Sequence, residues 1–152
     1  MIYLDSASVT DAQAAEKLGW VKGITTNPTL LAHCDLSPVD TLQQRVQISP
    51  GELYYQLTGS DFEGMIAEGR KAYSLIGEKT VLKVPATAVG FKVVACLAPK
   101  IPCAVTAICS AAQAAVSTDS RGEIWDRLCL SCYPTLRRWF SLGTRYGKCA
   151  EG

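Results

Sequence analysis

Residues 80–106, TVLKVPATAVGFKVVACLAPKIPCAVT, contain two short apolar runs with a stretch of helical length between them. The runs at 80–84 and 102–107 have the length and the valine content of buried strands, whereas 87–97 is long enough for a helix. Two buried strands joined by a helix are typical of a parallel β-α-β unit. This stretch therefore predicts a parallel α/β fold.

The same alternation continues outward from this stretch. Further strands are predicted at 2–5, 20–25 and 52–57. Helices are predicted between Ser8 or Thr10 and Gly19, and at 29–33, about 38–47, 60–76 and from 110 to 116. Five βα units result, and a complete barrel of eight units needs roughly 200 to 250 residues. We therefore expect an α/β fold that is an incomplete (β/α)8 TIM barrel of about five βα units, in a chain of 152 residues.

A doubly wound open sheet is the alternative fold, because it would suit the length of the chain. Its usual marker is a glycine-rich turn after the first strand. Here the first strand continues into Asp5-Ser6-Ala7 instead. The barrel type is therefore the preferred interpretation.

Composition narrows the classes of function. The chain is 48% hydrophobic and 19% charged, with a formal net charge of +1, which fits one folded domain without the basic field that nucleic acid attracts. No apolar run reaches the roughly 18 residues of a membrane span, and the start, MIYLDS, lacks the basic region of a signal peptide. We expect a cytoplasmic protein with a small neutral or phosphorylated ligand, and no nucleic-acid or membrane partner.

The cysteines and the histidine give no metal or redox site. Seven cysteines are an odd number without a secretion signal, so we interpret them as buried or incidental thiols. The pair Cys129 and Cys132 has metal-ligand spacing but no second pair to complete a tetrahedral site. His33 is the single histidine, so no multi-histidine metal centre is expected.

Polar residues close the predicted strands, and in parallel α/β proteins reactive groups gather at the carboxyl ends of strands. These residues are Asp5, Thr25, Asn27, Gln56, Lys83 and Thr106.

Lys83 is the most informative of them, because it lies in the apolar run VLKVP. Burial disfavours the charged form of an amine, and a neutral amine attacks carbonyl groups, so Schiff-base chemistry is the natural hypothesis. Alternatively, Lys83 pairs with Asp5 or extends to the rim of the sheet. Carbon–carbon cleavage of a β-hydroxy ketone also needs an acid/base group, for which Asp5 is the best-placed carboxylate. The alternative role of Asp5 is a helix cap.

Four segments, YLDSAS, GITTNPTLL, LKVPAT and VTAICSAAQA, closely resemble the small transaldolases and the related fructose-6-phosphate aldolases in the same order and spacing. The resemblance covers residues 1 to about 116. It implies a class I aldolase barrel in which Lys83 forms the imine and Asp5 is the acid/base. It further implies that Thr25 and Asn27 contact substrate, while Gln56 and Thr106 position the water of imine formation. The family uses no cofactor and typically forms ring-like homo-oligomers.

Residues 117–152 differ in character from the preceding segment. They hold five of the seven arginines and two of the three tryptophans but only one alanine. The resemblance implies that this stretch should supply strand six, with an AxYVxR-like segment that carries a tyrosine acid/base and a phosphate-binding arginine, and then strands seven and eight. Neither that segment nor the βα pattern appears. We divide the chain into an aldolase-barrel part, 1–116, and a non-homologous tail, 117–152.

A shift of the reading frame near codons 116 to 118 is our hypothesis for this tail. Trp125-Asp126 and Trp139-Phe140 must each give glycine when read one base later. Both glycines agree with an alternative reading that resembles the missing family sequence. A genuine extension that covers the open sheet is the other interpretation.

Two functional hypotheses follow. The first is a transaldolase-like or fructose-6-phosphate aldolase-like enzyme, a Schiff-base carbon–carbon lyase or dihydroxyacetone transferase that acts on sugar phosphates in carbohydrate metabolism, such as the pentose phosphate pathway. The second is a catalytically inactive truncated fragment of such an enzyme. A Schiff-base aldolase for deoxyribose phosphate is a weaker alternative, because it leaves ITTNP unexplained.

Overall fold

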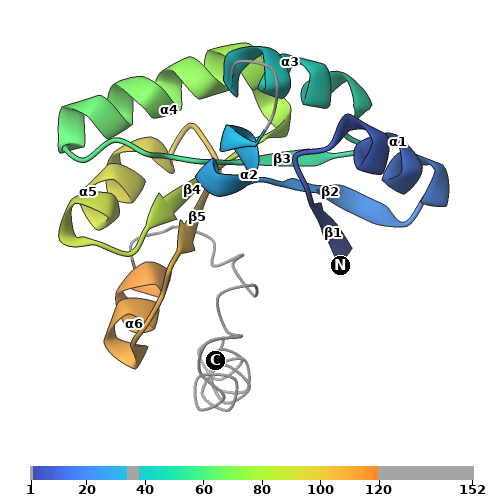
Figure 1. Cartoon of the computed structure of the whole chain (residues 1–152). Helices are drawn as coiled ribbons and strands as arrows, with labels where there is room; N and C mark the ends of the chain where they lie inside the picture. The colour runs from blue at the N-terminus through green and yellow to red at the C-terminus, as the bar shows by residue number, and fades with distance from the viewer. Residues whose placement is uncertain (1, 34–37, 120–152) are drawn as a thin grey trace.

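A five-stranded parallel sheet forms the centre of the computed structural model, which describes residues 2–33 and 38–119 (Figure 1). The strands lie side by side in chain order: β1 (Ile2–Asp5), β2 (Val21–Thr25), β3 (Glu52–Gln56), β4 (Thr80–Pro85) and β5 (Cys103–Thr106). A doubly wound sheet reverses its strand order near the middle. The sequential order instead confirms the predicted α/β class and is consistent with part of a (β/α)8 barrel.

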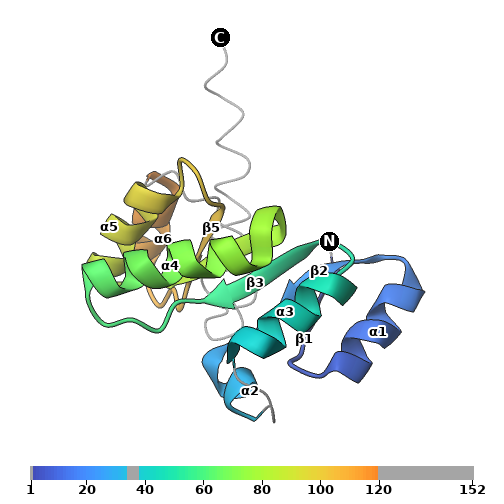
Figure 2. The same cartoon turned by 90° about the horizontal axis from the view of Figure 1, so that it is seen from above.

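Helices connect the strands, and α1, α3, α4 and α5 follow an arc along one side of the sheet (Figures 1 and 2). The helices are α1 (Val9–Leu18), α2 (Pro28–Ala32), α3 (Pro38–Ile48), α4 (Phe62–Ile76), α5 (Ala88–Leu97) and α6 (Ala111–Asp119), with a 3-10 turn η1 (Gly77–Lys79). None of the helices in the described ranges is long and apolar enough to cross a membrane.

Local sequence signals set the helix ends. Ser8 caps α1 by accepting from the Asp11 N–H, and Gly19 ends it in the left-handed conformation at φ 71°. Asp61 and Thr87 cap α4 and α5 in the same way as Ser8. The predicted start of α1 and its end at Gly19 are thus confirmed.

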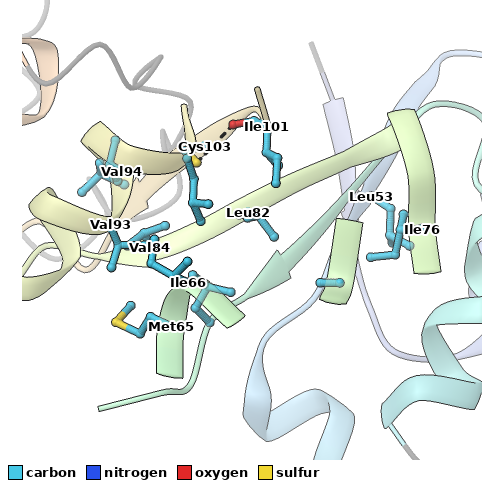
Figure 3. Close-up of a cluster of buried hydrophobic side chains, with 14 of the residues drawn as sticks. Leu53, Met65, Ile66, Ile76, Leu82, Val84, Val93, Val94, Ile101 and Cys103 are labelled. Atoms are coloured by element: carbon cyan, nitrogen blue, oxygen red, sulfur yellow. Dashed lines mark hydrogen bonds between the residues drawn. The ribbon is translucent and has the colours of Figure 1, made fainter. Parts of the chain in front are cut away.

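The outer face of the sheet packs against the helices and forms the main core. Alternate strand residues such as Leu53, Leu82 and Val84 point to this side and are fully buried. Figure 3 shows Val84 near Ile66 of α4, and Leu53 beside Ile76 of the same helix. Because successive strand residues face opposite sides, the intervening residues, Lys83 included, lie on the inner face.

Several strand ends differ by one residue from the prediction, and two of these differences have a clear physical reason. Pro85 lies just beyond the strand predicted at 80–84 but belongs to β4, paired with Thr106. The pairing of β3 ends where Gln56 meets Lys83, so the missing N–H of Pro85 removes no bond to β3. Ala107, predicted within the fifth strand, has φ 58° and so leaves it.

The other elements agree with the predictions to within about two residues, as is usual for element ends. Only α6 runs further, to Asp119, beyond the predicted end of the barrel part at residue 116. The hypotheses about Trp125, Trp139, Cys129 and Cys132 concern positions outside the described residues.

Candidate active site

Lys83 lies on the inner face of the sheet, in the second half of β4. Its side chain is 9% exposed. Its Nζ donates to Thr25 Oγ1 and to the Thr26 carbonyl oxygen, both at 3.4 Å. The two acceptors are neutral, so Lys83 adopts neither a pairing with Asp5 nor an extension to the rim of the sheet.

Gln56 and Thr106 flank Lys83 on the neighbouring strands. Gln56 of β3 is the register partner of Lys83, and Thr106 of β5 pairs with Pro85, two residues further along β4. Register partners in a parallel sheet direct their side chains to the same face, so both side chains share the inner face with Lys83. Thr106 is buried and Gln56 half-buried. The structure therefore brings these predicted residues together.

Asp5 ends β1 and pairs in register with Thr25. It lies on the inner face but is exposed, and β2 and β3 separate its strand from that of Lys83. The alternative role of Asp5 as a helix cap is excluded, because Ser8 caps α1. Its carboxylate thus stands at the rim, on the far side of Thr25 from Lys83.

Asn27 was predicted to contact substrate, and the structure gives it a second role as a helix cap. Its Oδ1 accepts from the Leu30 N–H at 2.9 Å and so caps α2. Asn27 follows Thr25 and Thr26, the two acceptors of Lys83. Its cap fixes the turn after β2 beside the lysine.

Thr26 was missed by sequence reasoning. This threonine is fully buried, its carbonyl oxygen accepts from Lys83, and its hydroxyl donates to the Tyr54 carbonyl oxygen at 2.8 Å. The sequence did contain a sign of this role, because two threonines follow one another at the end of an apolar strand. Only Thr25 was chosen as a candidate site residue.

A second polar layer lies nearer the amino ends of the strands and was also missed. Glu52 accepts from the hydroxyls of Tyr3 and Tyr54, at 2.7 and 3.2 Å, and the two rings meet edge to face. Burial and the Glu52 carboxylate raise the pKa of both tyrosines. The sequence pattern that could have predicted this layer is the alternation Glu52, Tyr54, Gln56, which places all three residues on one face of β3.

The described cysteines and the histidine contribute nothing to this face. Cys103 is buried in the outer core, and burial raises the pKa of its thiol to about 12. Cys96 and Cys109 are exposed free thiols, and His33 ends α2 at the surface. Across 2–33 and 38–119, no three His, Cys, Asp or Glu side chains are grouped so as to hold a metal ion.

The arrangement has a defined chemical capacity. A primary amine on the inner face is surrounded by hydroxyl, amide and carbonyl groups, with one carboxylate at the rim. Such groups can bind the oxygens of a polyhydroxylated carbonyl compound while the amine attacks its carbonyl carbon.

Known proteins are similar to this chain over the segments that form the sheet and the candidate site. The model of the Transaldolase/Fructose-6-phosphate aldolase family matches residues 2–133. A probable transaldolase of Anaeromyxobacter dehalogenans is 39% identical over 92 residues, which are 60% of this chain and 42% of that protein. One of Nitrosopumilus maritimus is 32% identical over 120 residues, or 78% of this chain and 54% of that protein.

A probable transaldolase of Desulfotalea psychrophila is 39% identical over 113 residues, covering 74% of this chain and 52% of that protein. The chain thus spans about half the length of the curated relatives it matches. The family match contains every strand that the structure describes, together with Lys83 and the polar residues around it. This chain therefore belongs to the transaldolase/fructose-6-phosphate aldolase family.

Proposed function

We propose that the chain carries the Schiff-base site of an aldolase or transaldolase, with Lys83 as the nucleophile. The observation that supports this most is the burial of the Lys83 amine on the inner face, where its hydrogen bonds go only to neutral oxygens. A lysine that served only as an ion-pair partner would face a carboxylate there. The proposed substrates are sugar phosphates or dihydroxyacetone.

The chemistry proceeds in two stages. Lys83 Nζ adds to the ketone carbon, and the resulting carbinolamine takes up a proton from an acid and loses water to give a protonated imine. A base then removes the proton of the β-hydroxyl, the carbon–carbon bond breaks, and its electron pair moves into the imine to give an enamine. The aldehyde fragment leaves. Protonation of the enamine (lyase) or its attack on a second aldehyde (transferase) gives a new imine, and hydrolysis of that imine releases the ketone product and frees Lys83.

Each neighbouring residue has a proposed role. Asp5 is the acid/base, acting from the rim. Gln56 and Thr106 position the water that is released in imine formation and consumed in imine hydrolysis. Thr25 and Asn27 contact the substrate, and Thr25 also holds the amine at 3.4 Å until substrate arrives.

The proposed setting is carbohydrate metabolism in the cytoplasm, in or near the pentose phosphate pathway. No cofactor takes part in this scheme, because the imine itself accepts the electron pair. Homo-oligomers are proposed for the intact family type, and neither nucleic acid nor membrane is a proposed partner.

The open sheet favours the second candidate function, an inactive fragment. Within the described residues β1 and β5 are edge strands, and five strands do not close a barrel. Ile2 on β1 is 58% exposed, and such edges promote association with other chains.

Trapping the imine separates the two candidates. The folded protein is incubated with dihydroxyacetone or fructose 6-phosphate, reduced with borohydride, digested and analysed by mass spectrometry. An adduct confined to Lys83 supports the enzyme, with Lys83→Met as the control that must lose it and the exposed Lys22 as an internal control. No Lys83 adduct on soluble, folded protein would refute the enzyme and favour the inactive fragment.

A further inference from the structure

Gln113 joins the loops that follow β4 and β5. Its side chain extends from the first turn of α6, and its Nε2 donates to the Ala86 carbonyl oxygen at 2.9 Å. Its Oε1 accepts from the Cys109 N–H at 2.8 Å. One amide group therefore ties the end of β4 to the loop that leaves β5.

Both loops follow strands that carry residues of the candidate active site. Ala86 lies three residues after Lys83, and its N–H donates to the Thr106 carbonyl oxygen at 2.9 Å. Ala107, which follows Thr106, is held at φ 58°, a conformation that alanine rarely adopts. Such backbone persists only where surrounding contacts impose it. The contact of Gln113 with Cys109 is one that restrains this loop.

Helix capping explains only half of this arrangement. Ser110 Oγ accepts from the Gln113 N–H at 3.2 Å, and Ser110 with Gln113 has the spacing of a capping box. A capping box uses the side-chain oxygen of Gln113, and it does not involve the side-chain nitrogen, Nε2. The bond from Nε2 to Ala86 reaches another loop and does nothing for α6 itself.

We infer that Gln113 is a positioning residue, which fixes the ends of β4 and β5 so that Lys83 and Thr106 keep their relative placement. The predicted effect on imine formation rests on the proposed function. The predicted effect on the mobility of the two loops is independent of that function.

Gln113→Glu separates positioning from capping. The glutamate keeps an acceptor for Cys109 but replaces the donor to Ala86 with an oxygen that repels its carbonyl. Gln113→Ala removes both contacts, and Gln13→Ala, on the exposed face of α1, is the matched control. The readouts are the rate of Lys83 trapping by dihydroxyacetone and borohydride, amide hydrogen exchange at Ala86, and the thermal midpoint.

The inference predicts that both Gln113 variants slow Lys83 trapping about fivefold or more and speed Ala86 exchange by a similar factor, the effect of about one lost hydrogen bond. Gln13→Ala should leave both rates at the wild-type value. A Gln113→Glu variant that behaves like wild type in both readouts would overturn the inference in favour of capping alone. If the wild type forms no Lys83 adduct, the proposed function fails, and Ala86 exchange alone decides for or against the role of Gln113.

Discussion

Lys83 on β4 and Thr25 on β2 are joined by a hydrogen bond of 3.4 Å that crosses the whole width of β3. Neighbouring strands lie about 4.8 Å apart, so β2 and β4 would be almost 10 Å apart in a flat sheet. The lysine side chain bridges this gap because it lies over the inner face. This bond therefore links two strands that share no backbone pairing.

A double-mutant cycle measures that link. Thr25→Val, Lys83→Met and the double variant are compared with wild type by urea denaturation. We expect a coupling free energy of about 1 kcal/mol or less, the usual net value of one hydrogen bond, because the bond is long. A coupling indistinguishable from zero would mean that the two side chains do not interact in solution.

Gly90 lets α5 approach the end of β4, and its replacement should be costly. A Cβ at Gly90 would overlap the Pro85 carbonyl oxygen, which belongs to a strand and cannot move aside. In an open helix, glycine to alanine stabilises by about 1 kcal/mol. We expect Gly90→Ala to destabilise instead, by about 2 kcal/mol or more, as overpacking does.

Gly64→Ala in α4 is the matched control for Gly90→Ala. Its Cβ would meet the Asp61 carboxylate at 3.1 Å, and this side chain can shift. Denaturation midpoints of the two variants test the comparison. Equal effects of the two substitutions would contradict the packing argument.

Sequence patterns predicted the fold well because each βα unit carries its own local signals. The apolar run around Lys83 and the caps at Ser8 and Thr87 depend on neighbours within a few residues. The place of Lys83 on the inner face also follows from alternation within β4.

Contacts between distant segments could not be predicted in this way. The bond from Lys83 to the Thr26 carbonyl oxygen joins residues 57 positions apart, and it depends on the register between strands. The bond from Gln113 to Ala86 likewise needs the relative placement of two loops. Ala107 was assigned to a strand because its type gives no sign of a positive φ.

Glu68 holds the loop that follows Gln56, and we expect its loss to loosen that loop. Its carboxylate accepts from the Tyr55 hydroxyl at 2.8 Å, from the N–H and hydroxyl of Thr58 at 3.0 to 3.1 Å, and from the Gly59 N–H at 2.9 Å. Glu68→Ala should lower the free energy of unfolding by about 2 kcal/mol, since several charge-assisted bonds disappear at a partly exposed site.

Exposed Glu63 on the same helix provides the control for Glu68. Glu63→Ala should cost only a few tenths of a kcal/mol through the helix dipole. Hydrogen exchange at Thr58 and Gly59 should accelerate in the Glu68 variant alone. Unchanged exchange at both amides would show that the loop is held by other contacts.

The tyrosine layer beneath Lys83 predicts an alkaline loss of stability. Burial and Glu52 raise the pKa of Tyr54 above its ordinary value of about 10. The stabilisation from neutral Tyr54 is complete below that unfolded-state pKa and is lost as the pH rises towards the folded-state pKa, because the unfolded chain releases the proton first. From pH 10 to 11 this group alone should lower the unfolding free energy by about 1 kcal/mol.

Tyr54→Phe should remove this contribution, so its unfolding free energy should fall by about 1 kcal/mol less than that of wild type between pH 10 and 11. Urea denaturation at the two pH values measures the difference. Tyr73→Phe on α4, outside the cluster of Tyr3, Glu52 and Tyr54, controls for loss of a hydroxyl and should retain the wild-type pH dependence. Parallel pH profiles for wild type and Tyr54→Phe would rule out this tyrosine as the source of the alkaline loss, since a buried phenol beside the Glu52 carboxylate is destabilised when it loses its proton.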